Sequence, residues 1–226
     1  MRPPRMTQQP LVKKIGMGNT NYINDNDTLP VFPLPNTILF PGISIPLHIF
    51  EPRYRQMIKD CLDGKGVICL ATISEKWQGI NEGDFEFYPF GIACRIVNYN
   101  ALEDGRYNII LKGLERCELQ NCEYRKSKLY RTVQIKIREN DLKTPMNRSI
   151  ENELRQIAAN FFKTQPTSSS ESEINEHFAK MEIMQIINIL CMNAPISITN
   201  KHAIFAKETL TEICDSLLEL YATFRL

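Results

Sequence analysis

Residues 29–54 constrain the fold of this chain more than any other stretch, because prolines recur in it every few residues between short apolar runs. Proline fixes a backbone torsion and removes a hydrogen-bond donor, so such a segment specifies a backbone path. The proline within the apolar run 44–50 is typical of an edge strand or a bulge. Glu51 and Pro52 then favour a helix start, since proline loses no needed donor there and an acidic residue suits the helix dipole. The stretch therefore predicts architecture and offers little chemistry.

Composition and charge set the class of protein. The chain has 226 residues and 43% hydrophobic content, which is enough for a sizeable core. Lysine plus arginine (27) nearly balances aspartate plus glutamate (26), so no global field attracts nucleic acid or an anionic membrane. No run approaches the roughly 18 apolar residues of a membrane span, and no apolar signal core follows the N-terminal basic residues. These features predict a cytoplasmic protein.

The residues that most often carry chemistry are scattered. Seven cysteines, an odd number, never occur as Cys-x-x-Cys, which predicts buried thiols in a reducing compartment. The histidines, His48, His177 and His202, are too dispersed for a metal cluster. A catalytic thiol would need a depressed pKa and a histidine brought to it by the fold. We expect no catalytic residue, cofactor site or metal site.

The hydrophobic pattern divides the chain into three parts. Residues 1–27 are polar and predict a disordered tail, since they cannot bury enough surface to offset the entropy of ordering. Residues 28–142 read as short strands with one internal helix, which predicts a mainly antiparallel, barrel-like β domain. In residues 143–226 the apolar period becomes helical and predicts a helical bundle, with one helix starting at Ser170 and another at Thr199.

Several motifs together resemble a known family. They are Phe-Pro-Leu-Pro at 32–35, Leu-Phe-Pro-Gly at 39–42 and Pro-Leu-His-Ile-Phe-Glu-Pro-Arg-Tyr at 46–54, followed by Gly-Ile-Ala-Cys at 91–94, Asp-Gly-Arg at 104–106 and Leu-Lys-Gly-Leu-Glu-Arg at 111–116. This order resembles the N-terminal substrate-binding domain of Lon proteases, over residues 29–226. The resemblance implies an α+β fold, in which a PUA-like β pseudo-barrel with one internal helix precedes an α-helical subdomain. It agrees with the division made from periodicity.

The resemblance also sets an expectation for function. No Gly-x-x-x-x-Gly-Lys-Ser/Thr motif occurs in the sequence, so we expect a stand-alone Lon N-domain-like protein without ATPase or protease activity. Such a module would bind unfolded or partner polypeptides in protein quality control, and a separate protease is a candidate partner. Capture of unfolded chains needs exposed apolar surface. Large apolar residues that the pattern places in loops are therefore candidate contacts: Phe40, Trp77, Phe87, Tyr88 and Phe90. The alternative is that they fill the ends of the barrel.

The basic segment 124–131 supports a second class of function. It places Arg125, Lys126, Lys128 and Arg131 between two tyrosines, a composition that suits contacts with phosphates and bases. Because PUA-like folds include RNA binders, an RNA-binding protein is the alternative. The near-zero net charge opposes it, and a solvated hairpin connection explains the same residues. We therefore predict polypeptide binding first.

Overall fold

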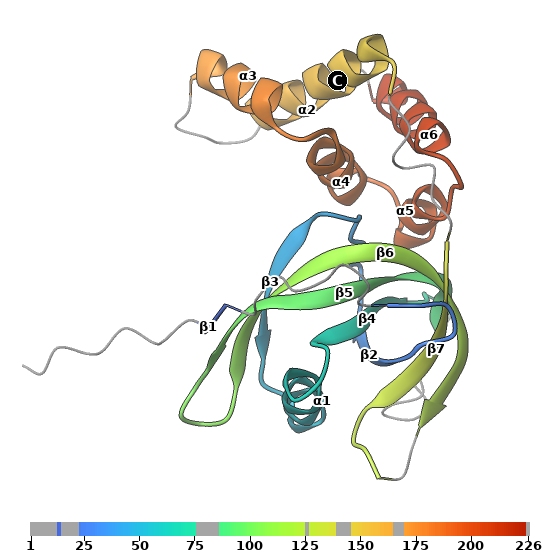
Figure 1. Cartoon of the computed structure of the whole chain (residues 1–226). Helices are drawn as coiled ribbons and strands as arrows, with labels where there is room; N and C mark the ends of the chain where they lie inside the picture. Colours follow the sequence, from blue (N-terminus) through green and yellow to red (C-terminus); the bar gives the residue numbers. More distant parts are fainter. Residues whose placement is uncertain are drawn as a thin grey trace, which may run out of the picture.

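The computed structural model describes residues 13–14, 23–75, 86–124, 127–138, 146–164 and 170–224. Figure 1 shows a β-rich half, with one helix against it, and a helical half above. The strands are β1 (Lys13–Lys14), β2 (Thr28–Leu34), β3 (Ser44–Ile49), β4 (Val67–Ile73), β5 (Phe87–Ala101), β6 (Tyr107–Tyr124) and β7 (Arg131–Ile137). The helices are α1 (Pro52–Leu62), α2 (Arg148–Lys163), α3 (Glu171–Lys180), α4 (Ile183–Asn193), α5 (Ile198–Phe205) and α6 (Leu210–Thr223).

The strands close into a ring. Their order is β1-β5-β4-β2-β7-β6-β3. An additional pairing of β5 with β6 closes the strands from β5 through β4, β2 and β7 to β6 into a ring. β2 and β4 run parallel, and the other pairs run antiparallel. β6 is long enough to pair with β3 at its start and with β7 at its end. The predicted α+β pseudo-barrel with one internal helix is confirmed, although the ring is not a regular barrel.

Small side chains from alternate positions fill the interior of the ring, and every strand that closes the ring contributes to it. The buried members of this cluster are Leu29, Val31, Val67, Cys69, Ala71, Ala93, Cys117, Val133 and Ile135. Since successive strand residues point to opposite faces, their neighbours Ile68 and Leu70 face the other way. Those neighbours belong to a larger core that runs under α1 and into the helical half.

A glycine lets the loop after β2 lie directly on β6. Gly42 N–H donates to the carbonyl of Gly113 (3.0 Å), and Gly113 N–H donates to that of Ile43 (2.9 Å). A Cβ at Gly113 would lie 2.7 Å from the Phe40 carbonyl oxygen, closer than real contacts allow. The loop therefore holds the Phe40 side chain at 0% exposure.

The helix boundaries follow local capping signals. α1 starts at Pro52, as expected, and buries Tyr54, Met57, Ile58 and Cys61. Ser170 starts α3, also as expected, and caps it in a capping box with Glu173. The apolar run after Ser170 forms two helices, so the prediction of one helix is wrong, and Glu182 starts α4 with a capping box of its own. Ser197, not Thr199, caps α5 by accepting from the Asn200 N–H (3.2 Å). No helix in the described ranges is long and apolar enough to cross a membrane.

Two parts of the predicted tail contact the β domain. Lys13 and Lys14 pair with Tyr99 and Asn98 of β5. Asn26 N–H donates to the Ile135 carbonyl at 2.8 Å. The segment from residue 23 to residue 27 is thus attached to the edge of β7, ahead of the predicted domain start.

Candidate functional site

The helical half is fixed to the β domain through the end of α5. Arg116 of β6 is fully buried, and its guanidinium donates to three main-chain carbonyls, those of Phe205 (2.5 Å), Lys207 (2.7 Å) and Glu208 (3.1 Å). The last carbonyls of a helix have no partner within the helix and carry the negative end of its dipole. A buried cation at this point satisfies the Phe205 carbonyl of the last turn and two carbonyls that follow the helix, and it joins two parts of the chain that are far apart in sequence.

A second arginine connects the same two parts of the chain. Arg138, directly after β7, donates to the Ala206 carbonyl (2.7 Å), and its guanidinium lies 4.5 Å from the centre of the Phe90 ring. Burial, and secondarily the charge of Arg138, lowers the pKa of Arg116 to about 10. Arg116 is therefore still cationic at neutral pH.

His202 connects α5 to the start of β5. It is 4% exposed, its Nε2 lies 2.9 Å from the Phe90 carbonyl oxygen, and its ring stacks on Tyr88 at 4.4 Å. A carbonyl only accepts, so Nε2 carries a proton and donates. Desolvation lowers the pKa of His202, and the bond to Phe90 opposes that shift. The Tyr88 hydroxyl also forms a hydrogen bond with the Thr199 hydroxyl (2.7 Å), at the solvent-exposed side of this contact.

The loop after β2 contacts the helical half as well. Phe40 N–H donates to Asn188 Oδ1 of α4 (3.3 Å), and the Phe40 ring meets the Phe205 ring edge-on at 5.3 Å. The β domain thus contacts both α4 and α5. This set of contacts, from Arg116, Arg138, His202 and Phe40, is called the joint below.

The candidate aromatics are distributed between the joint and the ring. Phe40, Tyr88 and Phe90 lie in the joint, where α4 and α5 cover the Phe40 side chain, so Phe40 is not exposed. Phe87 is half-buried and packs against the cluster inside the ring, which fits the alternative that it fills a barrel end. Trp77 lies outside the described residues.

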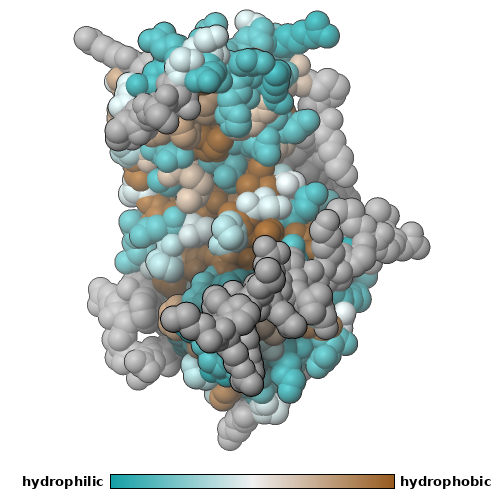
Figure 2. All heavy atoms as spheres, turned by 90° about the vertical axis from the view of Figure 1, so that its left-hand side faces the viewer, coloured by the Kyte–Doolittle hydropathy of each residue, from teal (hydrophilic) through white to brown (hydrophobic). Residues whose placement is uncertain are grey.

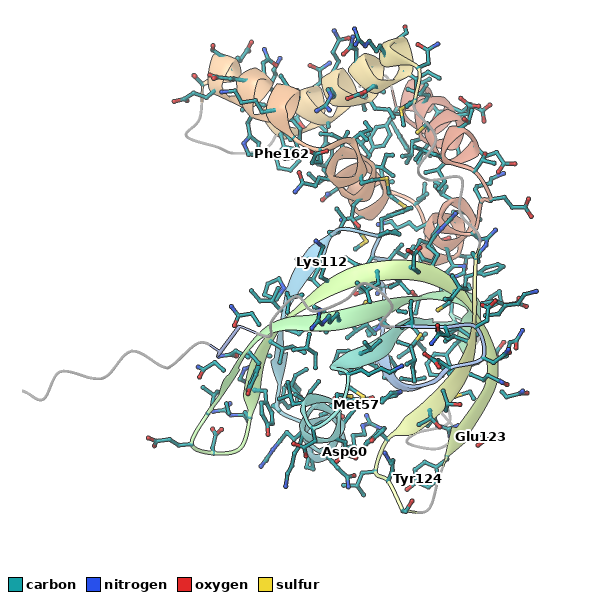
Figure 3. The ribbon with its side chains drawn as sticks, viewed as in Figure 1. Met57, Asp60, Lys112, Glu123, Tyr124 and Phe162 are labelled. Carbon is teal, nitrogen blue, oxygen red and sulfur yellow. The ribbon has the colours of Figure 1, made fainter. Side chains whose placement is uncertain are left out.

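A different apolar surface remains open beside the joint. Figure 2 shows hydrophobic side chains gathered between the two halves on the face seen from the left of Figure 1, where α2 and α3 extend over β3. Figure 3 shows Phe162 on the underside of the helical half and Lys112 on the opposite, β side of this space. The half-buried apolar residues of the bordering segments define what is called the apolar band: Ile43, Ile45, Phe162, Met181 and Met184.

Sequence reasoning missed the apolar band. Phe162 and Met184 sit on helical stripes that predict a core position, and half-burial is not visible in such a stripe. The signal that could have found them is the pair of adjacent aromatics, Phe161 and Phe162, at the end of α2. Adjacent residues point in different directions on a helix, so both cannot be buried against one neighbour.

In the basic segment, Lys128 contacts neighbouring side chains. Lys128 Nζ donates to the Tyr130 hydroxyl (2.7 Å) and lies 3.5 Å from an Asp60 carboxylate oxygen. Tyr130 in turn donates to Asp60 (2.7 Å). Arg131 is half-buried at the start of β7, and Arg125 and Lys126 lie outside the described residues. Asp60 thus offsets the charge of Lys128 on this face.

The thiols are buried with one exception. Cys122 is exposed, so the prediction that all the cysteines are buried is wrong at this position. Desolvation is the first cause that raises the pKa of Cys61, Cys191 and Cys214, each to about 12. Within the ranges that the structure describes, no three His, Cys, Asp or Glu side chains gather as a metal site would require.

Solved structures share this fold. The N-terminal domain of the Mycobacterium avium complex Lon protease superposes with a TM-score of 0.63 at 13% identity, covering 87% of this chain and 98% of that one. The Lon N-terminal domain protein from Xanthomonas campestris gives a TM-score of 0.58 at 19% identity, with the same coverages. At these identities the likeness establishes the fold alone.

Sequence relatives point to the same group. The Lon protease of Flavobacterium johnsoniae is 27% identical over 195 residues, which is 82% of this chain and 22% of the relative. The Lon protease of Parabacteroides distasonis is 34% identical over 94 residues, 41% of this chain and 11% of the relative. The chain thus spans a minor part of the length of the relatives it matches.

A family model covers both halves. The model of the ATP-dependent protease La (Lon) substrate-binding domain matches residues 28–222, from β2 through the β domain and the joint into α6. The chain therefore belongs to the family of Lon substrate-binding domains.

Proposed function

We propose that this chain is a non-enzymatic polypeptide-binding module that takes up unfolded or extended segments of other proteins at the apolar band. The observation that carries the proposal is the band itself, a set of half-buried apolar side chains between two halves that the joint holds in place. Contiguous exposed apolar surface on a soluble protein marks a site for a partner. Membership of a substrate-binding domain family supports this role.

The composition of the band suits many different segments. Met181 and Met184 have flexible, polarisable side chains that adapt to different neighbours, and Phe162 supplies a large contact area. Exposed polar residues, such as Glu182 and Gln185, alternate with them along the chain. A site of this kind favours apolar side chains in general over one particular sequence.

The proposal extends to the setting of the protein. We place it in the cytoplasm, in protein quality control, with unfolded polypeptides as its ligands and a separate protease as a second partner. Its own 226 residues would supply binding, with no ATPase or protease step. The RNA-binding alternative gains no support from Lys128, which pairs with Asp60.

Binding of a permanently unfolded protein tests the proposal. A reduced, carboxymethylated and fluorescently labelled protein is titrated with wild type and with Phe162→Ser combined with Met184→Ser, while circular dichroism checks folding. Loss of a large apolar contact weakens binding by about 1.5–3 kcal/mol, or about tenfold or more. The matched control is Phe224→Ser at the end of α6, where the side chain is 37% exposed. Equal affinity of all three proteins contradicts the proposal.

A parallel titration with single-stranded RNA tests the alternative. RNA binding with a steep salt dependence, lost in Lys128→Gln combined with Arg131→Gln, would replace polypeptide binding as the function. We expect that this same variant still binds the unfolded protein as wild type does.

A further inference from the structure

The far end of β5 has a strand edge that the ring does not use. β4 pairs with β5 only up to Arg95, and Ile96 N–H donates to Gly66 at the end of that ladder. Beyond this point β5 continues to Ala101 as one arm of a hairpin with β6. On its other edge, this arm meets only β1 among the described residues, through Lys13 and Lys14. An open strand edge of this kind is a template for another extended chain.

The part of the occupant of this edge that the structure describes is short. β1 pairs through two residues, Lys13 with Tyr99 and Lys14 with Asn98. A ladder this short offers few hydrogen bonds against the entropy lost when the segment is ordered. A longer extended segment that continued past Asn100 would form more bonds with the same edge. The edge is therefore occupied by a segment that a better partner can displace.

The opposite edge of the same sheet is protected. β3 is the outer strand there, and its exposed Pro46 lacks the N–H that a further strand would need. Residues 97–101 of β5 contain no proline. An added strand is therefore directed to β5.

A depression on the face of the sheet extends from β3 across β6 to Asn98 and Asn100 of β5, next to which an added strand would place its side chains. It has a volume of about 570 Å³ and is lined by Pro46, Leu47, His48, Asn98, Asn100, Asn108, Ile109 and Ile110. The register places Asn98 and Asn100 on one face with their β6 partners Ile110 and Asn108. Every second residue of an added strand lies on that face. Its apolar floor and amide rim suit an extended segment with apolar residues at alternate positions.

We propose that the β5 edge at Asn98–Asn100 is a strand-accepting site for substrate polypeptide, kept occupied by the chain's own residues 13–14 until an extended segment displaces them. The proposal rests on the polypeptide-binding function above. Figure 1 shows β1 at the end of β5 on the left, the side on which the apolar band opens. Main-chain bonds would add affinity without requiring a particular sequence.

Two double variants of the full chain test this exchange. Lys13→Pro with Lys14→Pro removes the backbone donors of β1, and Lys13→Ala with Lys14→Ala keeps them while removing the charges. We expect the proline variant to bind the unfolded protein more tightly, by about tenfold if the edge is open a tenth of the time. The alanine variant should bind as wild type does. Equal affinity of the proline variant and wild type, or an equal gain in both variants, overturns the proposal.

Hydrogen exchange gives a readout independent of the apolar band. In the proline variant, the amides among residues 98–100 that face β1 should exchange faster than in wild type, and a peptide copy of residues 9–18 added in trans should slow them again. Unchanged exchange in the variant, or no protection by the peptide, overturns the strand-accepting site. If Phe162→Ser with Met184→Ser fails to weaken binding while this exchange pattern is seen, the apolar band is the part that fails.

Discussion

Replacing Arg116 by methionine tests whether the joint stabilises the whole fold. The substitution keeps the apolar volume of the side chain and removes the three hydrogen bonds to carbonyls at the end of α5 and just after it. Phe205 is 2% exposed, so its carbonyl is left buried without this donor, whereas Lys207 and Glu208 are exposed and their carbonyls can bind water. The three carbonyls therefore contribute unequally.

The expected loss follows from that difference. One buried acceptor without its donor costs about 1–3 kcal/mol, and each of the other two bonds contributes about 1 kcal/mol net. Release of the buried guanidinium offsets part of this, because a buried charge carries a desolvation penalty. We expect the free energy of unfolding to fall by about 3 kcal/mol. Arg116→Lys should not restore it, since one ammonium cannot reach three carbonyls arranged for a planar fork.

Urea unfolding followed by circular dichroism measures the loss. The matched control is Arg53→Met, which breaks a half-buried ion pair with Glu51 (2.7 Å); about 0–1 kcal/mol is typical of ion pairs at a protein surface. In the Arg116→Met variant, hydrogen exchange should also become faster in residues 198–208 before it becomes faster in α2. A loss for Arg116→Met no larger than that for Arg53→Met would refute the reasoning.

Three further outcomes follow from other groups. Because the pKa of His202 is lowered in the folded protein, the unfolded state takes up a proton at this residue first as the pH falls. The free energy of unfolding should therefore decrease below about pH 6.5, and this decrease should be smaller in His202→Gln. Urea midpoints at pH values near 7.5 and 5.5 measure the difference. Identical falls in both proteins would contradict this. A thiol reagent should label Cys122 in the native protein ahead of the buried cysteines, although desolvation raises the pKa of this thiol and slows its reaction; native labelling that survives Cys122→Ser would be the contrary result. Gly113→Ala should lower the free energy of unfolding by about 1–3 kcal/mol, as thermal unfolding measures. Gly64→Ala, whose Cβ would have its nearest neighbour at 3.7 Å, should change it little. Similar melting of the two variants would contradict the inference that Gly113 is needed for close contact with the Phe40 carbonyl.

Local signals were sufficient to predict the elements that depend on neighbours in sequence. The start of α1 at Pro52 and the capping box at Ser170 both follow from residues within one helical turn. The break between α3 and α4 was not predicted, because the apolar pattern continues through Met181 and hides it. Only the capping box at Glu182 marks the boundary.

The pairing of distant segments could not be read in the same way. Nothing in the local pattern of β2 tells that it lies parallel to β4, and nothing around Phe40 or Tyr88 tells that α4 and α5 cover them. The local pattern around Arg116 does not indicate that this side chain is buried, because its partners are carbonyls about 90 residues later in the chain. Burial of that kind depends on how one half docks on the other.

The joint also affects how freely this protein can change in evolution. Arg116 and Arg138 bind main-chain carbonyls of residues 205–208, and every residue type has such a carbonyl. Substitutions at Ala206, Lys207 or Glu208 therefore leave the arginines their acceptors, provided that α5 still ends at the same place. Mutational tolerance should be high on the helical side of the joint and low at the two arginines, so the surface there can diversify without loosening the two halves.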